Sequence, residues 1–318
     1  MPYKQEPPFA IQVEMTEGCN LMCDFCGING IRAKAGNYKF LTPVLAASVA
    51  NSIHNAGWTS RIEFAMHGEP TLNPEYVRII EVFRRFLPKN QLMMTTNGAG
   101  LLKGDCNINI RNLFAAGLNL LAIDDYKFST AADRLRSQID AAIGFVDYPK
   151  DSLDFSPHRR WPPKTHRVIF IEDLNTAKSG SHSNLTNHCG CAGKPTSAPV
   201  AKRCAKPFRE LSVRWNGTIA LCCNDWRGIY KIGDIVDRTL PELWNNDRFT
   251  AARKKLYAGD RDFGACAGCD YTTYRNGLLP DKLGRDILEP ANADDEKAIT
   301  RACAGETFTQ IVLRPWEK

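Results

Sequence analysis

The stretch "FAIQVEMTEGCNLMCDFCGI", residues 9–28, decides what kind of protein this chain forms. Its first seven residues predict a β-strand, and the strand leads directly into a loop with three cysteines in eight positions, Cys19, Cys23 and Cys26. A disulfide uses two thiols and a structural zinc site takes four ligands, so three cysteines fit neither. Thiolates also hold iron–sulfur clusters, and a four-iron cluster held by three cysteines keeps one iron open. An open position is what separates a catalytic metal site from a structural one.

Size and composition indicate a soluble globular protein. The chain has 318 residues, 43% hydrophobic and 24% charged, enough for one large domain or for one domain with a smaller companion. No apolar run approaches the roughly 20 residues of a membrane span, and no apolar segment follows a basic start at the N-terminus. We therefore expect a cytoplasmic protein without membrane contact, in the host cytoplasm if it is viral. Most of the twelve cysteines lie in tight groups, and there is no secretion signal, which indicates metal or redox chemistry rather than disulfides.

Strand-like and helix-like segments alternate through the first half of the chain. Strands are expected over residues 9–15, 61–66, 91–96, 119–124 and 167–172, and helices over 42–57, 74–86, 109–116 and 131–145. The first of these helices has Thr42 as its N-cap, Pro43 in its first turn and Gly57 beyond its end. This alternation predicts an α/β fold with a parallel sheet built from right-handed crossovers. Ligands bind to such sheets at the loops that follow the strands.

The spacing C-x3-C-x2-C directly after the first strand resembles the signature of radical S-adenosylmethionine (SAM) enzymes. The resemblance implies a partial (β/α) barrel, here of five to six parallel strands, because we find no convincing sixth strand. It implies a [4Fe-4S] cluster held by Cys19, Cys23 and Cys26, whose open iron binds SAM. Reductive cleavage of SAM then yields a 5′-deoxyadenosyl radical that abstracts a hydrogen atom. Phe25 stands where family members usually carry an aromatic residue near the adenine. The alternative is a zinc knuckle completed by a distant His or Cys.

A motif after the second strand resembles a further SAM contact of the same family. "HGEPTLNP", residues 67–74, contains Gly68, Glu69 and Pro70, and this "GEP" resembles the segment that binds the SAM amino group. Gly68 would let the backbone approach the ligand, and Glu69 is the conspicuous polar residue. A simple turn before the helix that starts at Pro74 is the alternative.

Polar residues also follow the third and fourth strands. "TTNG", residues 95–98, stands where the family often supplies hydroxyl and amide contacts to the SAM ribose and carboxylate. Thr96 and Asn97 are the candidates, although Asn-Gly is also a common turn. Asp124 and Asp125, in "AIDDY", are candidates for contact with ribose or substrate. An acidic strand end that faces solvent is the alternative, and Glu172 after the fifth strand has the same two readings.

The alternating pattern breaks after the fifth strand. Residues 175–203 are rich in Ser, Gly, Asn and Pro without a hydrophobic period, which indicates a linker or an irregular lobe. "FRELSVRWNGTIALCC", residues 208–223, predicts a hairpin with Asn-Gly at its turn, and a helix is expected over 241–256. With a boundary near residue 185, the predicted parts are a core over 1–185 and a linker with a small Cys-rich domain over 186–318.

Cysteines of the C-terminal part form a second pattern: a single Cys, a hairpin ending in Cys-Cys, a helix and then C-x2-C. The pattern resembles the SPASM/Twitch extension of radical SAM enzymes, which holds auxiliary iron–sulfur clusters. The resemblance implies an auxiliary [4Fe-4S] cluster closed by four thiolates, those of Cys204, Cys222, Cys266 and Cys269. A closed site suits electron transfer or structure rather than SAM cleavage. A zinc ribbon with the same ligands is the alternative.

Five cysteines belong to neither of these two ligand sets, and they are Cys106, Cys189, Cys191, Cys223 and Cys303. Cys223 is a candidate hydrogen-atom donor, as in some radical SAM epimerases of peptides and aminosugars, and burial as a small hydrophobe is the alternative. Cys189 and Cys191, in the linker, are candidate ligands of a further cluster or metal on the weak signal of one Cys-x-Cys pair. Cys106 and Cys303 are isolated, and we expect them to be structural.

The sequence does not identify the substrate, and three readings stay open. The opening "EPPFAIQVEMTEGCN", the linker "SNLTNHCG" and the compact length resemble phage radical SAM isomerases, which move a glycyl group from nitrogen to carbon on modified thymine in viral DNA. The second reading is a radical SAM epimerase, dehydrogenase or peptide-modifying enzyme with a small or peptide substrate. The third, of another class, is a non-catalytic zinc protein that binds nucleic acid. Either enzyme needs an electron donor such as flavodoxin or ferredoxin.

Basic residues between positions 158 and 209 are candidates for contact with a phosphate backbone. The net charge of +6 permits an anionic partner without indicating one, and a solvated basic surface is the alternative. Besides "HRRWPPKTHR" at 158–167, the basic residues are Lys194, Lys202, Arg203, Lys206 and Arg209.

Overall fold

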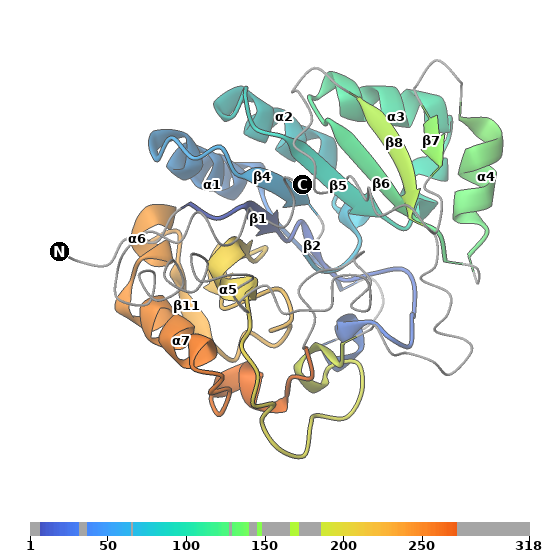
Figure 1. The fold of residues 1–318 in the computed structure, drawn as a ribbon. Helices are drawn as coiled ribbons and strands as arrows, with labels where there is room; N and C mark the ends of the chain where they lie inside the picture. Colours follow the sequence, from blue (N-terminus) through green and yellow to red (C-terminus); the bar gives the residue numbers. More distant parts are fainter. Residues whose placement is uncertain are drawn as a thin grey trace, which may run out of the picture.

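Figure 1 shows a computed structural model of the chain, which describes residues 7–31, 37–64, 66–126, 129–139, 145–147, 166–171 and 186–271. Within these residues, nine strands form one sheet in the spatial order β11-β10-β9-β1-β4-β5-β6-β8-β7. The five strands expected from the sequence are present as β1 (Ala10–Val13), β4 (Arg61–Phe64), β5 (Leu92–Thr96), β6 (Leu120–Asp124) and β8 (Arg167–Ile171). Each runs parallel to its neighbours among these five, so the expected α/β fold with a parallel sheet is confirmed.

Two further strands extend the parallel part of the sheet. β7 (Phe145–Asp147) pairs with β8, and β9 (Glu210–Val213) pairs with β1. The prediction of one helix over 131–145 is wrong at its end, because α4 (Ala131–Gln138) stops before Ile139, whose backbone is extended, and Phe145 begins β7. The sequence contained no signal for β9 as a neighbour of β1, since parallel pairing of segments far apart in the chain leaves no local pattern.

Helices cover one face of the sheet, and they are α1 (Pro43–Asn55), α2 (Tyr76–Phe86) and α3 (Cys106–Ala115) (Figure 1). The predicted N-cap of α1 is confirmed, because Thr42 Oγ1 accepts a hydrogen bond from Leu45 N at 3.2 Å. Alternate strand residues point to this face and form the main hydrophobic core with the helices. Cys106 is buried in this core, which agrees with a structural role. Other core members, from the neighbouring strands β9, β1 and β4, are Ile11, Val13, Ile62, Phe64, Leu211 and Val213.

The opposite face of the sheet divides into a polar and an apolar part. By strand alternation Gln12, Glu63 and Ser212, on β1, β4 and β9, lie on this face, which we call the inner face. Over β5, β6 and β8 the inner face instead carries a small apolar cluster, Met93, Leu120, Ala122 and Ile169. The polar part of the inner face therefore lies next to the C-terminal strands, and the apolar part lies away from them.

Short elements complete the fold. They are β2 (Thr16–Glu17), β3 (Lys39–Phe40), β10 (Thr218–Ala220), β11 (Lys231–Asp234), α5 (Lys206–Arg209), α6 (Leu240–Trp244), α7 (Asp247–Tyr257) and the 3₁₀ helices η1 (Gly27–Gly30), η2 (Pro70–Leu72), η3 (Ala99–Leu102), η7 (His188–Gly190) and η8 (Gly264–Gly268).

The predicted C-terminal hairpin is confirmed as β9 and β10, and β11 pairs antiparallel with β10. Its turn has the expected residues: Gly217 has a φ of +86°, and Asn216 Oδ1 accepts a hydrogen bond from Thr218 N at 3.1 Å. The single helix expected over 241–256 is wrong, because Asn246 caps a second helix, α7, directly after α6. The hairpin and both helices are packed into the same hydrophobic core as β1.

The predicted domain boundary near residue 185 lies outside the described residues, as does the first part of the predicted linker. It therefore stays a prediction. On both sides of it the chain contributes to one sheet and one core, because Ile11 and Val13 of β1 share that core with Leu211 and Val213 of β9.

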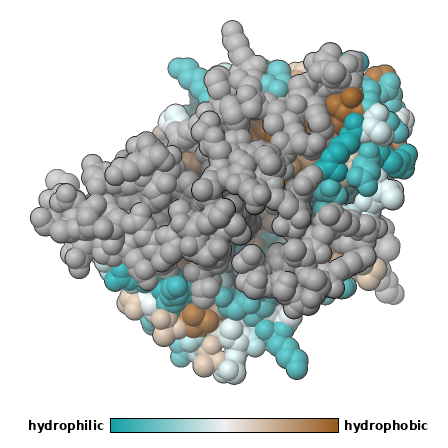
Figure 2. All heavy atoms as spheres, turned by 45° about the vertical axis from the view of Figure 1, so that its right-hand side comes forward, coloured by the Kyte–Doolittle hydropathy of each residue, from teal (hydrophilic) through white to brown (hydrophobic). Residues whose placement is uncertain are grey.

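The described surface is mainly hydrophilic on the face shown in Figure 2, where the hydrophobic areas are small and separate. Over the described chain the strongly exposed large hydrophobic residues are scattered, and they are Met22, Val44, Ile108, Ile229 and Val236. Within the same part of the chain, no helix has both the length and the apolar character needed to cross a bilayer.

The shared sheet predicts that the fragment 1–185 does not fold alone. Without β9, the edge of β1 loses its backbone partner, and the apolar face of β1 loses Leu211 and Val213. We expect the purified fragment to be aggregated or to unfold without cooperativity in urea, as followed by circular dichroism. A sharp, reversible transition of the monomeric fragment would contradict this and would make residue 185 a true folding boundary.

Candidate active site

Three cysteines lie on the loop that follows β1, as expected. Backbone contacts shape this loop: Cys26 N donates to Cys23 O at 3.0 Å, and Leu21 N donates to the Cys19 sulfur at 3.4 Å. Cys23 is buried, whereas Cys19 and Cys26 are partly exposed. No three His, Cys, Asp or Glu side chains of the described chain converge as ligands of one ion. Thiols spread over a loop instead suit a cluster, in which each iron takes its own thiolate.

Gly68 brings the loop after β4 against the start of the cysteine loop. It has a φ of +62°, and a Cβ at this position would collide with the carbonyl oxygens of Thr16 and Gly18. Glu69 N donates to Gly18 O at 2.8 Å, and Pro70 then opens η2. The close approach that Gly68 permits is thus to the protein backbone, and contact of Gly68, Glu69 or Pro70 with SAM stays a prediction.

The Glu69 carboxylate connects the loops that follow β4 and β5. Its Oε1 accepts hydrogen bonds from Thr71 N at 3.0 Å, Thr71 Oγ1 at 2.6 Å and Thr96 Oγ1 at 2.5 Å, and its Oε2 accepts one from Asn97 N at 2.8 Å. Burial raises the pKa of Glu69, although these four donors act in the opposite direction. Glu69 and Thr96 therefore have an internal structural role in this network.

Asn97 connects the same network to the first cysteine. Its Nδ2 donates to Asn20 Oδ1 at 2.9 Å and lies 3.8 Å from the Cys19 sulfur, while its Oδ1 accepts from Ala99 N at 3.0 Å. The structure thus brings the predicted residues Cys19, Glu69 and Asn97 together, as expected for loops at one end of a parallel sheet.

Asp124, after β6, lies beside two aromatic residues. Tyr126 donates its hydroxyl to Asp124 Oδ2 at 3.0 Å, and the rings of Tyr126 and Phe25 are 5.9 Å apart between centroids. Burial raises the pKa of Asp124 to about 7, and the Glu69 charge adds to the effect. Burial also raises the pKa of Tyr126, and the charges of Asp124 and the cysteines of the loop contribute. Tyr126 was not among the residues predicted from the sequence, although it ends the "AIDDY" segment, because nothing local places it against Phe25.

A buried ion pair that the sequence did not indicate joins β1 to the loop after β4. His67 Nδ1 lies 2.8 Å from Glu14 Oε1, and His67 Nε2 donates to Cys223 O at 2.7 Å. Glu14 also accepts from Arg214 Nε at 3.4 Å and from Trp215 N at 3.1 Å. Burial opposes ionisation of Glu14, but His67, Arg214 and the Trp215 amide outweigh it and lower the pKa of Glu14.

Trp226 packs between the cysteine loop and η7. Its ring stacks on His67 with 3.9 Å between centroids, and its Nε1 donates to His188 Nδ1 at 3.1 Å. Burial, together with the charges of His67 and Lys206, lowers the pKa of His188 to about 4, so its imidazole is neutral and can accept this bond. A Cβ on Gly27 would overlap the Trp226 ring, so the loop and the ring are in direct contact.

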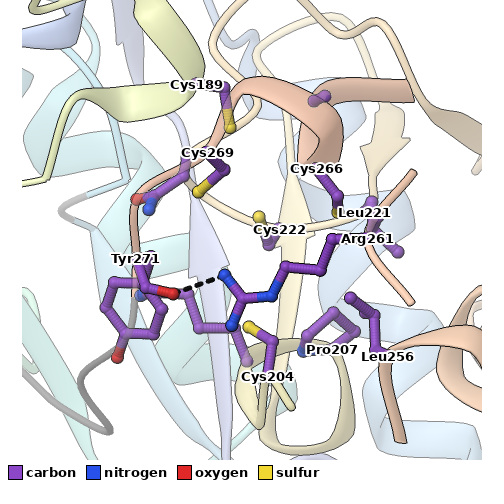
Figure 3. Close-up of a pocket in the computed structure, with 13 residues that line it drawn as sticks. Cys189, Cys204, Pro207, Leu221, Cys222, Leu256, Arg261, Cys266, Cys269 and Tyr271 are labelled. Carbon is purple, nitrogen blue, oxygen red and sulfur yellow. Dashed lines mark hydrogen bonds between the residues drawn. The ribbon is translucent and has the colours of Figure 1, made fainter. Parts of the chain in front are cut away.

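The four predicted auxiliary cysteines lie together around one pocket, and a fifth cysteine joins them (Figure 3). The four are Cys204, Cys222, Cys266 and Cys269, and the fifth is Cys189. Arg261 holds the Cys204 side, because its guanidinium donates to Lys202 O at 2.6 Å, to Arg203 O at 2.8 Å and to Tyr271 O. This donor set can provide each iron of a closed four-iron cluster with a thiolate.

The two cysteines of the predicted Cys-x-Cys pair face different sites. Cys189 lines the auxiliary pocket, whereas Cys191 packs with Ile28 and Trp226 beside Cys26 of the N-terminal loop. The two thiols therefore do not form one separate metal site together.

Cys223 lies next to a buried lysine. Lys206 Nζ is 3.2 Å from the Cys223 sulfur and 3.4 Å from Glu210 Oε2, and it lies over the Tyr271 ring at 4.8 Å. Burial raises the pKa of the Cys223 thiol even though the ammonium acts against it, so Cys223 keeps its proton at neutral pH. A protonated thiol is what a hydrogen-atom donor requires, and that role of Cys223 stays a prediction.

The basic residues proposed to receive a phosphate backbone do not form one exposed set. Lys206 and Arg209 are buried, and Arg209 lies over the Phe9 ring at 5.0 Å. Arg203 packs over the Tyr257 ring at 4.4 Å. Of the stretch at 158–167, all but the last two residues lie outside the described chain, as do Glu172 and Cys303.

The segments that contain the two groups of cysteines each match a known protein family. Residues 13–127 match the radical SAM superfamily, and residues 204–270 match the SPASM iron–sulfur cluster-binding domain. Over 82% of its length the chain is 20% identical to the S-adenosyl-L-methionine-dependent 2-deoxy-scyllo-inosamine dehydrogenase of Niallia circulans, 92% of which is covered. It is 30% identical to the GTP 3′,8-cyclase of Pasteurella multocida strain Pm70, over only 30% of this chain and 28% of that enzyme.

Solved structures share the fold. The crystal structure of BtrN in complex with AdoMet and 2-DOIA matches with a TM-score of 0.63 and 20% identity, over 86% of this chain and 97% of the other. BtrN in an open conformation matches with a TM-score of 0.57 and 18% identity, over 85% and 95% of the two chains.

Replacing Glu69 by Gln tests the network between the loops. Glu69→Gln keeps the side-chain shape but puts a donor amide where N–H and O–H groups need an acceptor. We expect the free energy of unfolding to fall by about 2–4 kcal/mol, because a buried donor loses its partner and the remaining bonds lose their charge. Urea unfolding followed by circular dichroism measures the change, with Glu75→Gln on the exposed surface as the control. Equal losses in both variants would contradict the structural role of Glu69.

The Asp124 carboxyl predicts a pH dependence of stability. Because its pKa is raised from 3.8 to about 7, the folded protein binds more protons than the unfolded chain between these values. This contribution to stability is therefore largest near pH 4, falls as the pH rises towards 7 and is constant above that. Asp124→Asn removes the titration, so the variant should gain about 2–4 kcal/mol relative to the parent between pH 4 and pH 8. Urea unfolding at several pH values measures this gain. Asp133→Asn on α4 is the control, and parallel pH profiles of parent and Asp124→Asn would contradict the buried carboxyl.

Proposed function

The chain is a radical SAM protein with a SPASM auxiliary-cluster domain, and from this premise we propose that it is an oxidoreductase acting on a small polar substrate. Its cofactors are a [4Fe-4S] cluster, SAM and an auxiliary iron–sulfur cluster, so the zinc alternatives for both cysteine groups are set aside. When bound, the N-terminal cluster and SAM supply a 5′-deoxyadenosyl radical, and an auxiliary cluster supplies a site that takes up an electron.

The observation that carries the proposal is the position of the thiol-lined pocket next to the polar part of the inner face. The auxiliary pocket has more thiols than a four-iron cluster has irons, so its site suits electron uptake rather than substrate binding. Lys206 both lines this pocket and contacts Glu210 of β9, which belongs to the polar part of the inner face. An electron leaving a substrate on that face would therefore have the auxiliary site as its neighbour.

The proposed reaction is the oxidation of a carbon that carries a hydroxyl or amino group. Cofactors bound at the cysteine loop would supply the radical that takes the hydrogen atom of this C–H bond. A cluster bound by the auxiliary thiols would take up the one electron that the carbon radical then loses. The proton of the hydroxyl or amino group goes to a carboxylate of the polar part, where Glu63 and Glu210 lie. The carbon and its heteroatom then form a double bond, so the substrate loses two hydrogen atoms in all.

Polar atoms on the inner face support a hydroxylated or aminated substrate. Within the described chain, Ser212 Oγ and Gln12 Oε1 are buried without a hydrogen-bond partner, and Gln12 Nε2 donates to Glu63 Oε2 at 3.2 Å. Unpaired buried polar atoms are costly, so a ligand that bonds to them would stabilise the site. The dehydrogenase of Niallia circulans acts, by its name, on an aminated cyclitol, which is the class of substrate that we propose here.

Epimerisation is the second candidate, and the position of Cys223 favours it. A thiol that keeps its proton beside Lys206 could return a hydrogen atom to the substrate radical, and no electron would then be removed. This reading needs no electron transfer to the auxiliary site, which distinguishes it from oxidation.

Isomerisation of glycyl-modified thymine, the first reading of the sequence, is not carried forward as our proposal. The relatives described above are a dehydrogenase and a GTP cyclase, and the predicted basic surface is partly buried. For the oxidoreductase we propose a cytoplasmic location and a flavodoxin or ferredoxin as the reductant.

The test is a mass-balance assay with the anaerobically loaded, reduced protein. With SAM and 2-deoxy-scyllo-inosamine deuterated at its carbinol carbons as the first probe, we expect deuterium in 5′-deoxyadenosine. We also expect a product that lacks two hydrogen isotopes of the substrate. Cys19→Ala should form no 5′-deoxyadenosine, and Cys223→Ala should keep its turnover.

Other outcomes of this assay separate the alternatives. A product of unchanged hydrogen count, together with loss of turnover in Cys223→Ala, would replace oxidation by epimerisation. If the loaded parent protein cleaves no SAM under reducing conditions, the proposed enzyme class is wrong.

A further inference from the structure

The auxiliary pocket contains one thiol more than a closed four-iron cluster can bind. Cys189 lines the pocket together with the four predicted ligands, and it lies outside the residues that match the SPASM family. In Figure 3 its sulfur points toward the Cys269 side chain, while Cys204 lies at the other end of the pocket near Pro207 and Arg261. Cys222, Cys266 and Cys269 line the pocket between these two ends, so a cluster held by these three thiols has a further thiol on each side, Cys189 on one and Cys204 on the other.

A set of hydrogen bonds holds Cys189 at this place. Asn187 Nδ2 donates to Gly268 O at 2.8 Å and to Lys194 O at 3.0 Å, and Asn187 N donates to Asp270 Oδ1 at 2.8 Å. Thr196 N also donates to Gly268 O at 3.2 Å. These bonds join the segment around Cys189 to the C-x2-C segment, in the way that Arg261 holds the segment around Cys204. The thiols at both ends of the pocket are therefore positioned by their own contacts.

The backbone at Cys189 is in a conformation that side chains disfavour. His188 and Cys189 have φ angles of 45° and 55°, and Gly190 follows with 82°. A non-glycine residue is strained in this region, and such strain persists where other contacts demand it. The turn directs Cys189 into the pocket, whereas Cys191 two residues later packs against Ile28 and Trp226.

We propose that Cys189 is an alternative ligand of the auxiliary cluster. Cys222, Cys266 and Cys269 bind three irons, and the fourth iron is bound by Cys204 or by Cys189. On exchange the entering thiol loses its proton and the leaving thiolate gains one, so no oxidant or reductant is needed. The auxiliary site thus stays closed when either thiol leaves. The inference requires an iron–sulfur cluster at this site, but it does not depend on the substrate or on the proposed oxidation.

Iron content of cysteine variants tests the proposal without an activity assay. All variants carry Cys19, Cys23 and Cys26 as Ala, so that only auxiliary iron is counted after anaerobic loading. We expect Cys204→Ala and Cys189→Ala, each alone, to retain about four iron and four sulfide per chain. We expect the double variant to lose at least half of this iron, or to hold a cluster whose electron paramagnetic resonance signal shifts on addition of imidazole, as an open iron would.

The matched control removes Cys191, the other cysteine of the Cys-x-Cys pair, in place of Cys189. Cys204→Ala combined with Cys191→Ala deletes the same number of thiols, and it should keep the iron content of Cys204→Ala alone. An equal loss in this control and in the Cys189 double variant would overturn the proposal. The proposal would also be overturned if Cys204→Ala alone already had the low iron content or the imidazole response that we expect of the double variant.

A second measurement uses the parent protein and does not depend on the folding of any variant. In the loaded protein, treated with iodoacetamide and mapped by mass spectrometry, we expect Cys189 and Cys204 each to be partly protected. The protection of Cys189 should disappear in cluster-free protein. Complete alkylation of Cys189 with complete protection of Cys204 in the loaded protein would overturn the proposal.

Discussion

The parallel pairing of β9 with β1 is the constraint on which both cysteine sites depend. It joins segments that are far apart in the chain, in the register Ala10↔Glu210 to Val13↔Val213. β1 leads into the N-terminal cysteine loop, and β9 begins the hairpin that is followed by Cys222 and Cys223. Once the two strands are neighbours, the loop and the hairpin lie on one rigid sheet, and a change in the position of one site requires a change in the sheet itself.

Two buried carboxylates hold the loops of the N-terminal site in place. Glu14 connects β1 to His67 and to Arg214 after β9, and Glu69 connects the loops after β4 and β5. Removing a single partner of a buried charge is strongly destabilising, because the charge is then left without compensation in a medium of low polarity. The site is thus organised around internal hydrogen bonds of the protein. Glu69, Thr96 and Asn97, which the sequence motifs assign to SAM, are structural connections of this kind.

Trp226 connects the two cysteine sites through direct packing. Its ring lies against Gly27 of the N-terminal loop and on His67, and its indole N–H bonds to His188, which directly precedes Cys189. Protein interiors transmit strain because they are densely packed. The distance between the two sites is therefore set by a short chain of contacts, and no flexible linker between the described residues of the two sites has to be invoked.

The sequence by itself determined the parts of this protein whose signals are local. The C-x3-C-x2-C spacing, the Thr42 cap and the Asn216-Gly217 turn all act over a few residues, and the alternating strands predicted the parallel sheet. The local signals gave the wrong end for one helix and missed the division of another. The α4 helix stops early because the backbone of Ile139 is extended, and the predicted helix over 241–256 is divided because Asn246 caps a new helix, α7. Only the tertiary structure decided which distant residues meet. It placed β9 beside β1, Tyr126 beside Phe25, and Cys189 in the auxiliary pocket while Cys191 faces the other site. Such contacts depend on packing and hydrogen bonds between segments that have no common pattern in the sequence, and a fold is needed before they exist.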